Sequence, residues 1–157
     1  MQSFQDSFKR SFVALTGVAV LALGGWAAAE TEEAAELKLY DGKPYRIYAD
    51  GKVDHGTWLG SRLYGNICFH CHGNKGAGSS FAPSLRGSLE RMSYEDFVTV
   101  VANGIQNVDA GSSSVMPAYG ENKTIMENVD GIYAYLKAAV DGALPVGNLM
   151  KKESEGN

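Results

Sequence analysis

Cysteine and histidine are scarce in this chain, which has 2 Cys and 3 His among its 157 residues. A function that needs a pair of cysteines would use both of them and leave none for another role. A zinc site requires about four nitrogen or sulfur ligands, and the chain offers few such side chains. Basic residues are also few, with 14 Lys and Arg against 18 Asp and Glu. A net charge of −4 argues against a nucleic-acid partner, because nucleic acid rewards a positive face. The length suits one domain.

Long apolar runs are missing after the first thirty residues, where nothing approaches the roughly 20 residues of a membrane helix. Those first residues have the order of a secretory signal peptide: Lys9 and Arg10, an apolar run over 12–23, then Ala27-Ala28-Ala29. We predict cleavage after Ala29 and a periplasmic protein that is not an integral membrane protein once processed. An uncleaved membrane anchor is the alternative.

The informative feature that is present is Cys68-Phe69-His70-Cys71-His72. Two cysteines three positions apart, followed directly by histidine, form the attachment signature of a c-type haem. The two thiols can reach the two vinyl groups on one edge of a porphyrin, and the adjoining imidazole can ligate the iron. The motif therefore predicts one covalently bound haem c, with thioether bonds to Cys68 and Cys71 and with His72 as proximal ligand.

Other chemistries of two cysteines are possible in principle. In an oxidising compartment a Cys-x-x-Cys pair can form a disulfide. A thioredoxin-like redox pair needs a strand before the motif and a βαβ setting, whereas a helix enters this motif. Zinc would have to use histidines of which two lie inside the motif itself. The haem interpretation accounts for the pattern best.

The rest of the chain is mostly helices and loops, with few strand signals. We expect a first helix capped by Thr57 that runs into Cys68, and a second between Ser93 and Gly104. A flexible loop is expected over 106–114, and a last helix carries an apolar stripe at Val129, Ile132, Tyr133, Leu136 and Val140. Such a core is marginal for roughly a hundred ordered residues, and a large apolar macrocycle would complete it.

The second axial ligand is open among several candidates: Met92, Met116, Met126, Met150, His55 and His70. Met92 and Met126 lie next to helix starts and suit packing. His70 lies between the two thioether positions and should point away from the iron, whereas His55 leaves a bis-histidine site possible. Met116 is favoured, because it lies in an irregular segment immediately before a proline, where a thioether can be held rigidly.

From about Leu59 to Val140 the chain resembles the class I cytochromes c. Gly60 and Tyr64 stand where this family crosses its first helix against its last, and Ala134-Tyr135-Leu136-Lys137 is similar to the matching last-helix segment. The resemblance implies an all-α class I cytochrome c fold, a small helical domain wrapped around one haem with an irregular N-terminal extension. The implied ranges are a signal peptide at 1–29, the extension at 30–56, the cytochrome c domain at 57–145 and a flexible tail at 146–157.

The same resemblance extends to the site. Ala82-Pro83-Ser84-Leu85 is similar to the family's proline segment, which implies that the Pro83 carbonyl accepts the Nδ1 proton of His72. Val115-Met116-Pro117 resembles the loop of the distal methionine, which implies that Met116 binds the iron.

A narrower resemblance covers nearly the whole mature chain. Three segments, 79–85, 101–108 and 128–137, are similar to the periplasmic cytochromes that serve PQQ-dependent alcohol dehydrogenases, including the cytochrome cL type. It implies an electron-transfer protein, not an enzyme, that accepts electrons from a PQQ-dependent methanol or ethanol dehydrogenase. A downstream cytochrome or terminal oxidase would be the acceptor.

Two competing functions remain at this point. One is a general periplasmic carrier that delivers electrons to a terminal oxidase. The other is a gas-binding or peroxidatic haem protein, which a closed His72 and Met116 pair disfavours because it leaves no free iron position for a substrate. The aromatic residues Tyr40, Tyr45, Tyr48 and Trp58 suit either partner docking or packing over the back of the domain, and packing is favoured.

Overall fold

The computed structural model describes residues 37–109, 112–147, 149 and 151. The expected signal peptide over 1–29, and Met150 among the ligand candidates, lie outside the described residues. Within those residues, no helix combines the length and the apolar character that crossing a membrane requires.

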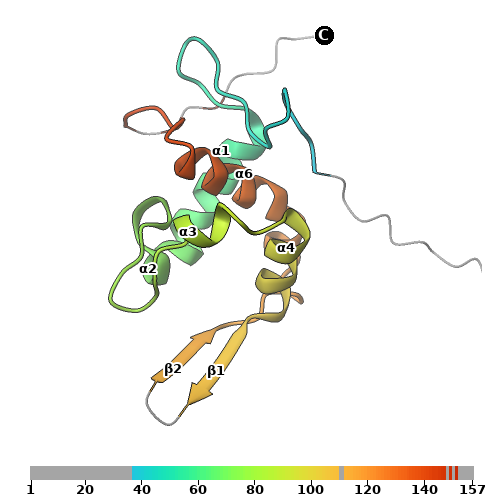
Figure 1. Cartoon of the computed structure of the whole chain (residues 1–157). Helices are drawn as coiled ribbons and strands as arrows, with labels where there is room; N and C mark the ends of the chain where they lie inside the picture. Colours follow the sequence, from blue (N-terminus) through green and yellow to red (C-terminus); the bar gives the residue numbers. More distant parts are fainter. Residues whose placement is uncertain (1–36, 110–111, 148, 150, 152–157) are drawn as a thin grey trace, which may run out of the picture. The chain divides into compact units, whose positions relative to one another are not determined.

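The described chain is mainly helical, with one small sheet (Figure 1). In chain order its elements are α1 (His55–Leu63), a π-helix (Tyr64–Cys68), α2 (Phe69–His72), a 3-10 turn (Asn74–Gly76), α3 (Arg86–Leu89), α4 (Tyr94–Asn103), β1 (Ile105–Asp109), β2 (Ser112–Met116), α5 (Lys123–Met126) and α6 (Val129–Val140). The helical architecture expected from the sequence is present, and the small sheet is an addition to the all-α expectation.

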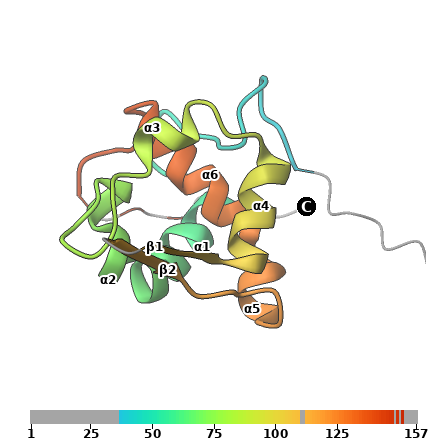
Figure 2. The ribbon, with the colours of Figure 1, turned by 60° about the horizontal axis from the view of Figure 1, so that its bottom comes forward.

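Helix α6 is the centre of the core. It packs across α1 and also touches α3 and α4 (Figures 1 and 2). The crossing with α1 is close because both helices carry glycine there, Gly60 and Gly131. Eight of the twelve residues of α6 are buried, so this helix holds the three others together.

The start of α1 corrects one expectation. Asp54, not Thr57, is the N-cap: its side chain accepts hydrogen bonds from the Thr57 amide (3.0 Å) and the Thr57 hydroxyl (2.6 Å). Thr57 is a fully buried residue of the first turn. The apolar periodicity begins only at Leu59, so the pattern placed the helix start about one turn late. The expected cap of Ser93 and the end of α4 at Gly104 are confirmed.

The segment 106–114 is the second correction, because it is not an irregular loop. Strands β1 and β2 form an antiparallel hairpin in which Ile105 pairs with Met116 and Asp109 with Ser112. Glycine directs the chain from α4 into β1, since Gly104 has a φ of 68°. The strands themselves are rich in polar residues and lack alternating apolar residues, so the sequence contained no periodic signal that would predict them.

The N-terminal segment folds back on the helical core. Asp41 and Gly42 both have positive φ (51° and 79°), the geometry of a two-residue hairpin turn, and Tyr40 pairs with Lys43 across it. Tyr45 is buried, and its hydroxyl donates to the Asp141 carboxylate at the end of α6. Its burial supports the packing interpretation for this aromatic residue.

Candidate functional site

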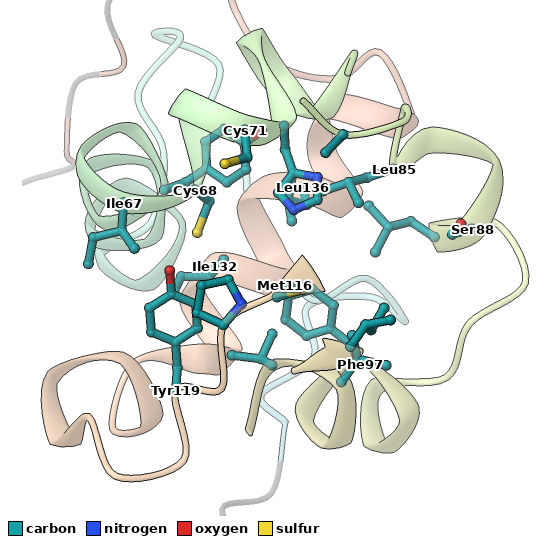
Figure 3. A pocket seen from close by; sticks show the side chains of 18 of the residues that line it. Ile67, Cys68, Cys71, Leu85, Ser88, Phe97, Met116, Tyr119, Ile132 and Leu136 are labelled. Atoms are coloured by element: carbon teal, nitrogen blue, oxygen red, sulfur yellow. The ribbon is translucent and has the colours of Figure 1, made fainter. Parts of the chain in front are cut away.

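A cavity of about 370 Å³ opens between the cysteine motif, α4, α6 and the end of β2. Its walls are mainly apolar side chains, and its volume falls within the range of small-molecule and cofactor sites. Five residues singled out in the sequence line it: Cys68, Cys71, His72, Pro83 and Met116. In Figure 3 the two cysteines lie on one side of the cavity, and Met116 and Tyr119 lie across from them.

The helical run leading to the motif places the cysteines at this cavity. Between α1 and α2 the chain passes through the π-helical turn Tyr64–Cys68, where the Phe69 amide bonds to the Tyr64 carbonyl. Such widened turns are rare in proteins, and a large share of them lie at functional sites. Cys68 is half-buried and Cys71 is exposed, and the two are not joined in a disulfide.

Cys68 has apolar surroundings at the cavity wall. Burial, with a smaller contribution from Cys71, raises the pKa of the Cys68 thiol to about 11. A sulfur in such surroundings suits a thioether bond to an apolar macrocycle.

The surroundings of His72 favour a neutral imidazole. Burial lowers its pKa, and the backbone carbonyl of Pro83 opposes that shift. A histidine must be neutral to ligate a metal ion. Among the described residues, the Nδ1 atom of His72 is the single buried side-chain nitrogen or oxygen without a hydrogen bond of normal geometry. Nδ1 is the nitrogen that the resemblance assigns to the Pro83 carbonyl, which leaves Nε2 to face a cofactor.

Met116 is fixed by the hairpin and by the end of α4. It pairs with Ile105, the first residue of β1. The chain after it returns to α4, where the amides of Tyr119 and Gly120 donate to the carbonyls of Val101 (3.0 Å) and Ala102 (2.9 Å). The backbone of Met116 is thus fixed on both sides by hydrogen-bonded segments.

The other ligand candidates separate clearly. Met92 lines the cavity together with Met116, so two methionines face the same space. Met126 packs against the core without lining the cavity. Neither His55, which stacks on Trp58, nor His70, which meets the edge of Phe69, belongs to the cavity wall. Within the described ranges, no group of three His, Cys, Asp or Glu side chains is arranged to hold a metal ion.

One cavity residue was missed in the sequence. Tyr119 lines the cavity across from the cysteines (Figure 3). Burial raises the pKa of its hydroxyl, and Cys68 and Cys71 add to the shift because they lie nearby. Its position three residues after Met116 is the only signal that could have pointed to it.

These residues fit a covalently attached haem. The cavity provides apolar walls, two adjacent thiols, a neutral imidazole and a thioether across from the thiols. Closed apolar walls around few polar groups are what a porphyrin requires, and imidazole with thioether is an established pair of axial ligands.

Comparisons with known proteins agree with this site. The family described as "Cytochrome C oxidase, cbb3-type, subunit III" matches residues 59–136. Cytochrome c-553I of Paracoccus denitrificans is 43% identical over 113 residues, or 72% of this chain and 50% of that protein. The chain thus spans half the length of that relative. Cytochrome c-555 of Methylococcus capsulatus is 35% identical over 102 residues, covering 64% of this chain and 76% of that protein.

A solved structure is similar as well. The crystal structure of the c-type cytochrome XoxG from Methylobacterium extorquens AM1 matches with a TM-score of 0.62 and 41% sequence identity. The match covers 73% of this chain and 70% of that one.

Proposed function

Because this chain belongs to the class I c-type cytochromes and carries one covalent haem c, we propose that it is a one-electron carrier of the periplasm that accepts electrons from a PQQ-dependent methanol or ethanol dehydrogenase. It would pass them on to the respiratory chain through a downstream cytochrome or a terminal oxidase. The observation that supports the carrier role is the meeting of the two thiols, the imidazole and a thioether in one apolar cavity.

The proposal assigns a role to each of these residues. Cys68 and Cys71 would form the thioether bonds, His72 and Met116 would bind the iron, and Pro83 would provide the carbonyl next to the imidazole. The haem would supply the one-electron couple. With the imidazole and the thioether both bound to the iron, no place would remain there for a substrate.

The protein also sets the direction of electron flow. A thioether ligand favours ferrous iron, so Met116 would raise the reduction potential and suit an acceptor of electrons from a quinone. Each alcohol that is oxidised leaves two electrons on the quinone of the dehydrogenase. Two successive one-electron transfers to this cytochrome are therefore needed per turnover. Encounters of this kind are brief and small in area.

The donor is tested by the rate of reduction. Purified ferric protein is mixed with purified PQQ-dependent methanol or ethanol dehydrogenase and alcohol, and the appearance of the ferrous spectrum is followed by stopped flow. Fast, saturable reduction is expected, and omission of the alcohol is the control. Slow reduction by both dehydrogenases would contradict the assigned donor while leaving the carrier role intact.

A general carrier to a terminal oxidase is the second candidate. It is favoured by the matched family, whose description names a subunit of a cbb3-type oxidase. Under this alternative the ferrous protein is oxidised rapidly by membranes that contain the oxidase, while the dehydrogenase reduces it slowly. The two rates, measured on one preparation, separate the candidates.

A gas-binding or peroxidatic role is tested with carbon monoxide. A site closed by His72 and Met116 does not bind carbon monoxide rapidly at neutral pH in the reduced protein. Rapid binding would contradict the closed site and therefore the carrier assignment.

Export is tested on the mature protein. Mass spectrometry of the periplasmic fraction should give a chain that begins at Glu30, as expected from cleavage after Ala29. A periplasmic protein that retains residues 1–29 would support the uncleaved anchor.

A further inference from the structure

Tyr64 has a buried hydroxyl that the proposed electron carrier does not otherwise use. The residue is 1% exposed and opens the π-helical turn before the motif. Its hydroxyl donates to the carbonyl oxygen of Gly73 (2.7 Å) and accepts from the amide of Gly76 (3.0 Å). One phenol oxygen thus ties both ends of the short turn that follows His72.

The turn held by Tyr64 has little freedom of its own. Gly73, Lys75, Gly76 and Gly78 all have positive φ, between 53° and 89°. The amide of Gly78 donates to the carbonyl of His72 at 2.8 Å, so the turn closes back on the proximal residue. A Cβ on Gly73 would lie 2.2 Å from the carbonyl oxygen of Gly78, which leaves room for no side chain. Such a turn keeps its conformation only while its polar groups are satisfied.

Gly76 connects this turn to the proline segment. Its carbonyl accepts hydrogen bonds from the Leu85 amide (2.9 Å) and from the Ser84 hydroxyl (3.2 Å). A continuous path therefore runs from the Tyr64 hydroxyl through Gly76 to residues 84 and 85, directly after Pro83. The carbonyl of Pro83 is the backbone group next to the imidazole of His72, whose Nδ1 makes no hydrogen bond of normal geometry here.

We propose that Tyr64 is a positioning residue for the proximal ligand: its hydroxyl, through Gly76 and Ser84, holds the Pro83 carbonyl against Nδ1 of His72 and thereby tunes the iron. The inference rests on the proposed ligand role of His72. A carbonyl that accepts the Nδ1 proton makes the imidazole a stronger donor, which stabilises ferric iron. Releasing that carbonyl weakens the donor and raises the reduction potential.

Tyr64→Phe removes the hydroxyl and keeps the ring that packs against Tyr135 at 5.3 Å between centroids. Three results are expected in the holoprotein. The Gly76 amide exchanges with solvent about tenfold faster or more, because its buried donor has lost its partner. The Nδ1 proton resonance of His72 moves in the reduced protein. The midpoint potential shifts upward while the haem spectrum keeps its ligand set.

Tyr135→Phe is the matched control, because it removes the other hydroxyl of the same ring pair. That hydroxyl makes no hydrogen bond to any of the described residues. It should change neither the Gly76 exchange rate nor the potential. Ser84→Ala breaks the far end of the path and is the second test should Tyr64→Phe fail to mature. It should raise the potential in the same direction and by less, because the Leu85 amide still holds Gly76.

The outcomes distinguish this inference from the function on which it depends. A Tyr64→Phe protein that unfolds more easily but keeps the wild-type potential and Nδ1 resonance would show that Tyr64 is only structural. A downward shift in either variant would also overturn the positioning role. Loss of the histidine ligation signature in the wild-type spectrum would instead contradict the proposed site.

Discussion

A methyl group on Gly60 would lie 1.9 Å from the carbonyl oxygen of Gly131. The two glycines let the backbones of α1 and α6 touch. This contact fixes the position of the cysteine motif, which follows α1, relative to the cavity wall formed by α6.

Gly60→Ala should therefore be strongly destabilising. The added Cβ meets backbone atoms, which cannot rotate away, so the two helices must separate at a cost of about 3 kcal/mol or more. Gly65→Ala is the control, since a Cβ there meets nothing within 4 Å. Denaturant titration of both holoproteins measures the difference, and equal midpoints would contradict the close crossing.

Met116→Ala should abolish the sulfur-to-iron charge-transfer band of the ferric protein and lower the reduction potential, because the thioether favours ferrous iron. Met92→Ala is the matched control, since Met92 lines the same cavity. It should keep the band and lose stability, by about 2 kcal/mol, because Met92 is only partly buried. A band that survives Met116→Ala and disappears with Met92→Ala would reverse the ligand assignment.

Gly104→Ala should disturb Met116 without touching its side chain. The substitution is strained because Gly104 has a φ of 68°, and its Cβ would lie 2.3 Å from the Met116 carbonyl oxygen. The hairpin must shift at the residue that bears the thioether, so the charge-transfer band should weaken. Gly87→Ala, where a Cβ meets nothing within 4 Å, is the control, and it should leave the band unchanged.

Asp54→Ala should cost more than an ordinary helix cap. The buried carboxylate accepts hydrogen bonds from the Thr57 amide, the Thr57 hydroxyl and, at 2.8 Å, the Arg46 amide. Loss of the cap and of these bonds should lower the free energy of unfolding by about 2–3 kcal/mol. Ser93→Ala removes the exposed cap of α4 and should cost about 1 kcal/mol. Thermal or urea unfolding compares the two.

The free energy of unfolding should fall in alkaline solution, in part because Tyr64 ionises more readily in the unfolded chain than in the folded protein. Burial raises its pKa to about 12 in the folded protein, although the bond from the Gly76 amide opposes this. An unfolded tyrosine ionises near pH 10, so above that pH the unfolded chain loses a proton that the folded chain keeps. Tyr64 therefore contributes about 2 kcal/mol to the free energy of unfolding below pH 10, and this contribution is lost as the pH rises toward 12.

Urea midpoints at pH 9 and pH 11.5 measure this loss. The wild type should lose more stability over the interval than Tyr64→Phe, which has no proton to lose at that position. Tyr40→Phe keeps Tyr64 and should follow the wild type. Parallel curves for the wild type and Tyr64→Phe would exclude the assigned contribution.

Local signals in the sequence predicted well wherever a local interaction decides the structure. Ser93 and Gly104 bound α4 because a hydroxyl cap and a glycine of positive φ act within one turn. The cap of α1 was misplaced because Asp54 precedes the first apolar residue of the stripe by five positions. The π-helical turn at Tyr64–Cys68 depends on a shifted hydrogen bond that no residue pattern records.

Interactions between distant segments explain what the sequence could not show. The strands of the β1–β2 hairpin carry no apolar alternation, and they continue directly from the end of α4. The Tyr64 hydroxyl acts on residues 9 and 12 positions ahead, through a turn whose shape comes from glycine backbone conformations. Met92 packs against the core as expected, and it also lines the cavity, which no local pattern indicated.

The parallel pairing of Val53 with Lys151 joins the end of the described chain to the segment before α1. Neither residue lines the cavity. A tether attached just beyond Lys151 would therefore hold the protein by a point that is not part of the cavity wall. Immobilised on an electrode or a sensor chip through that end, the cytochrome would keep the cavity lining clear of its own linker.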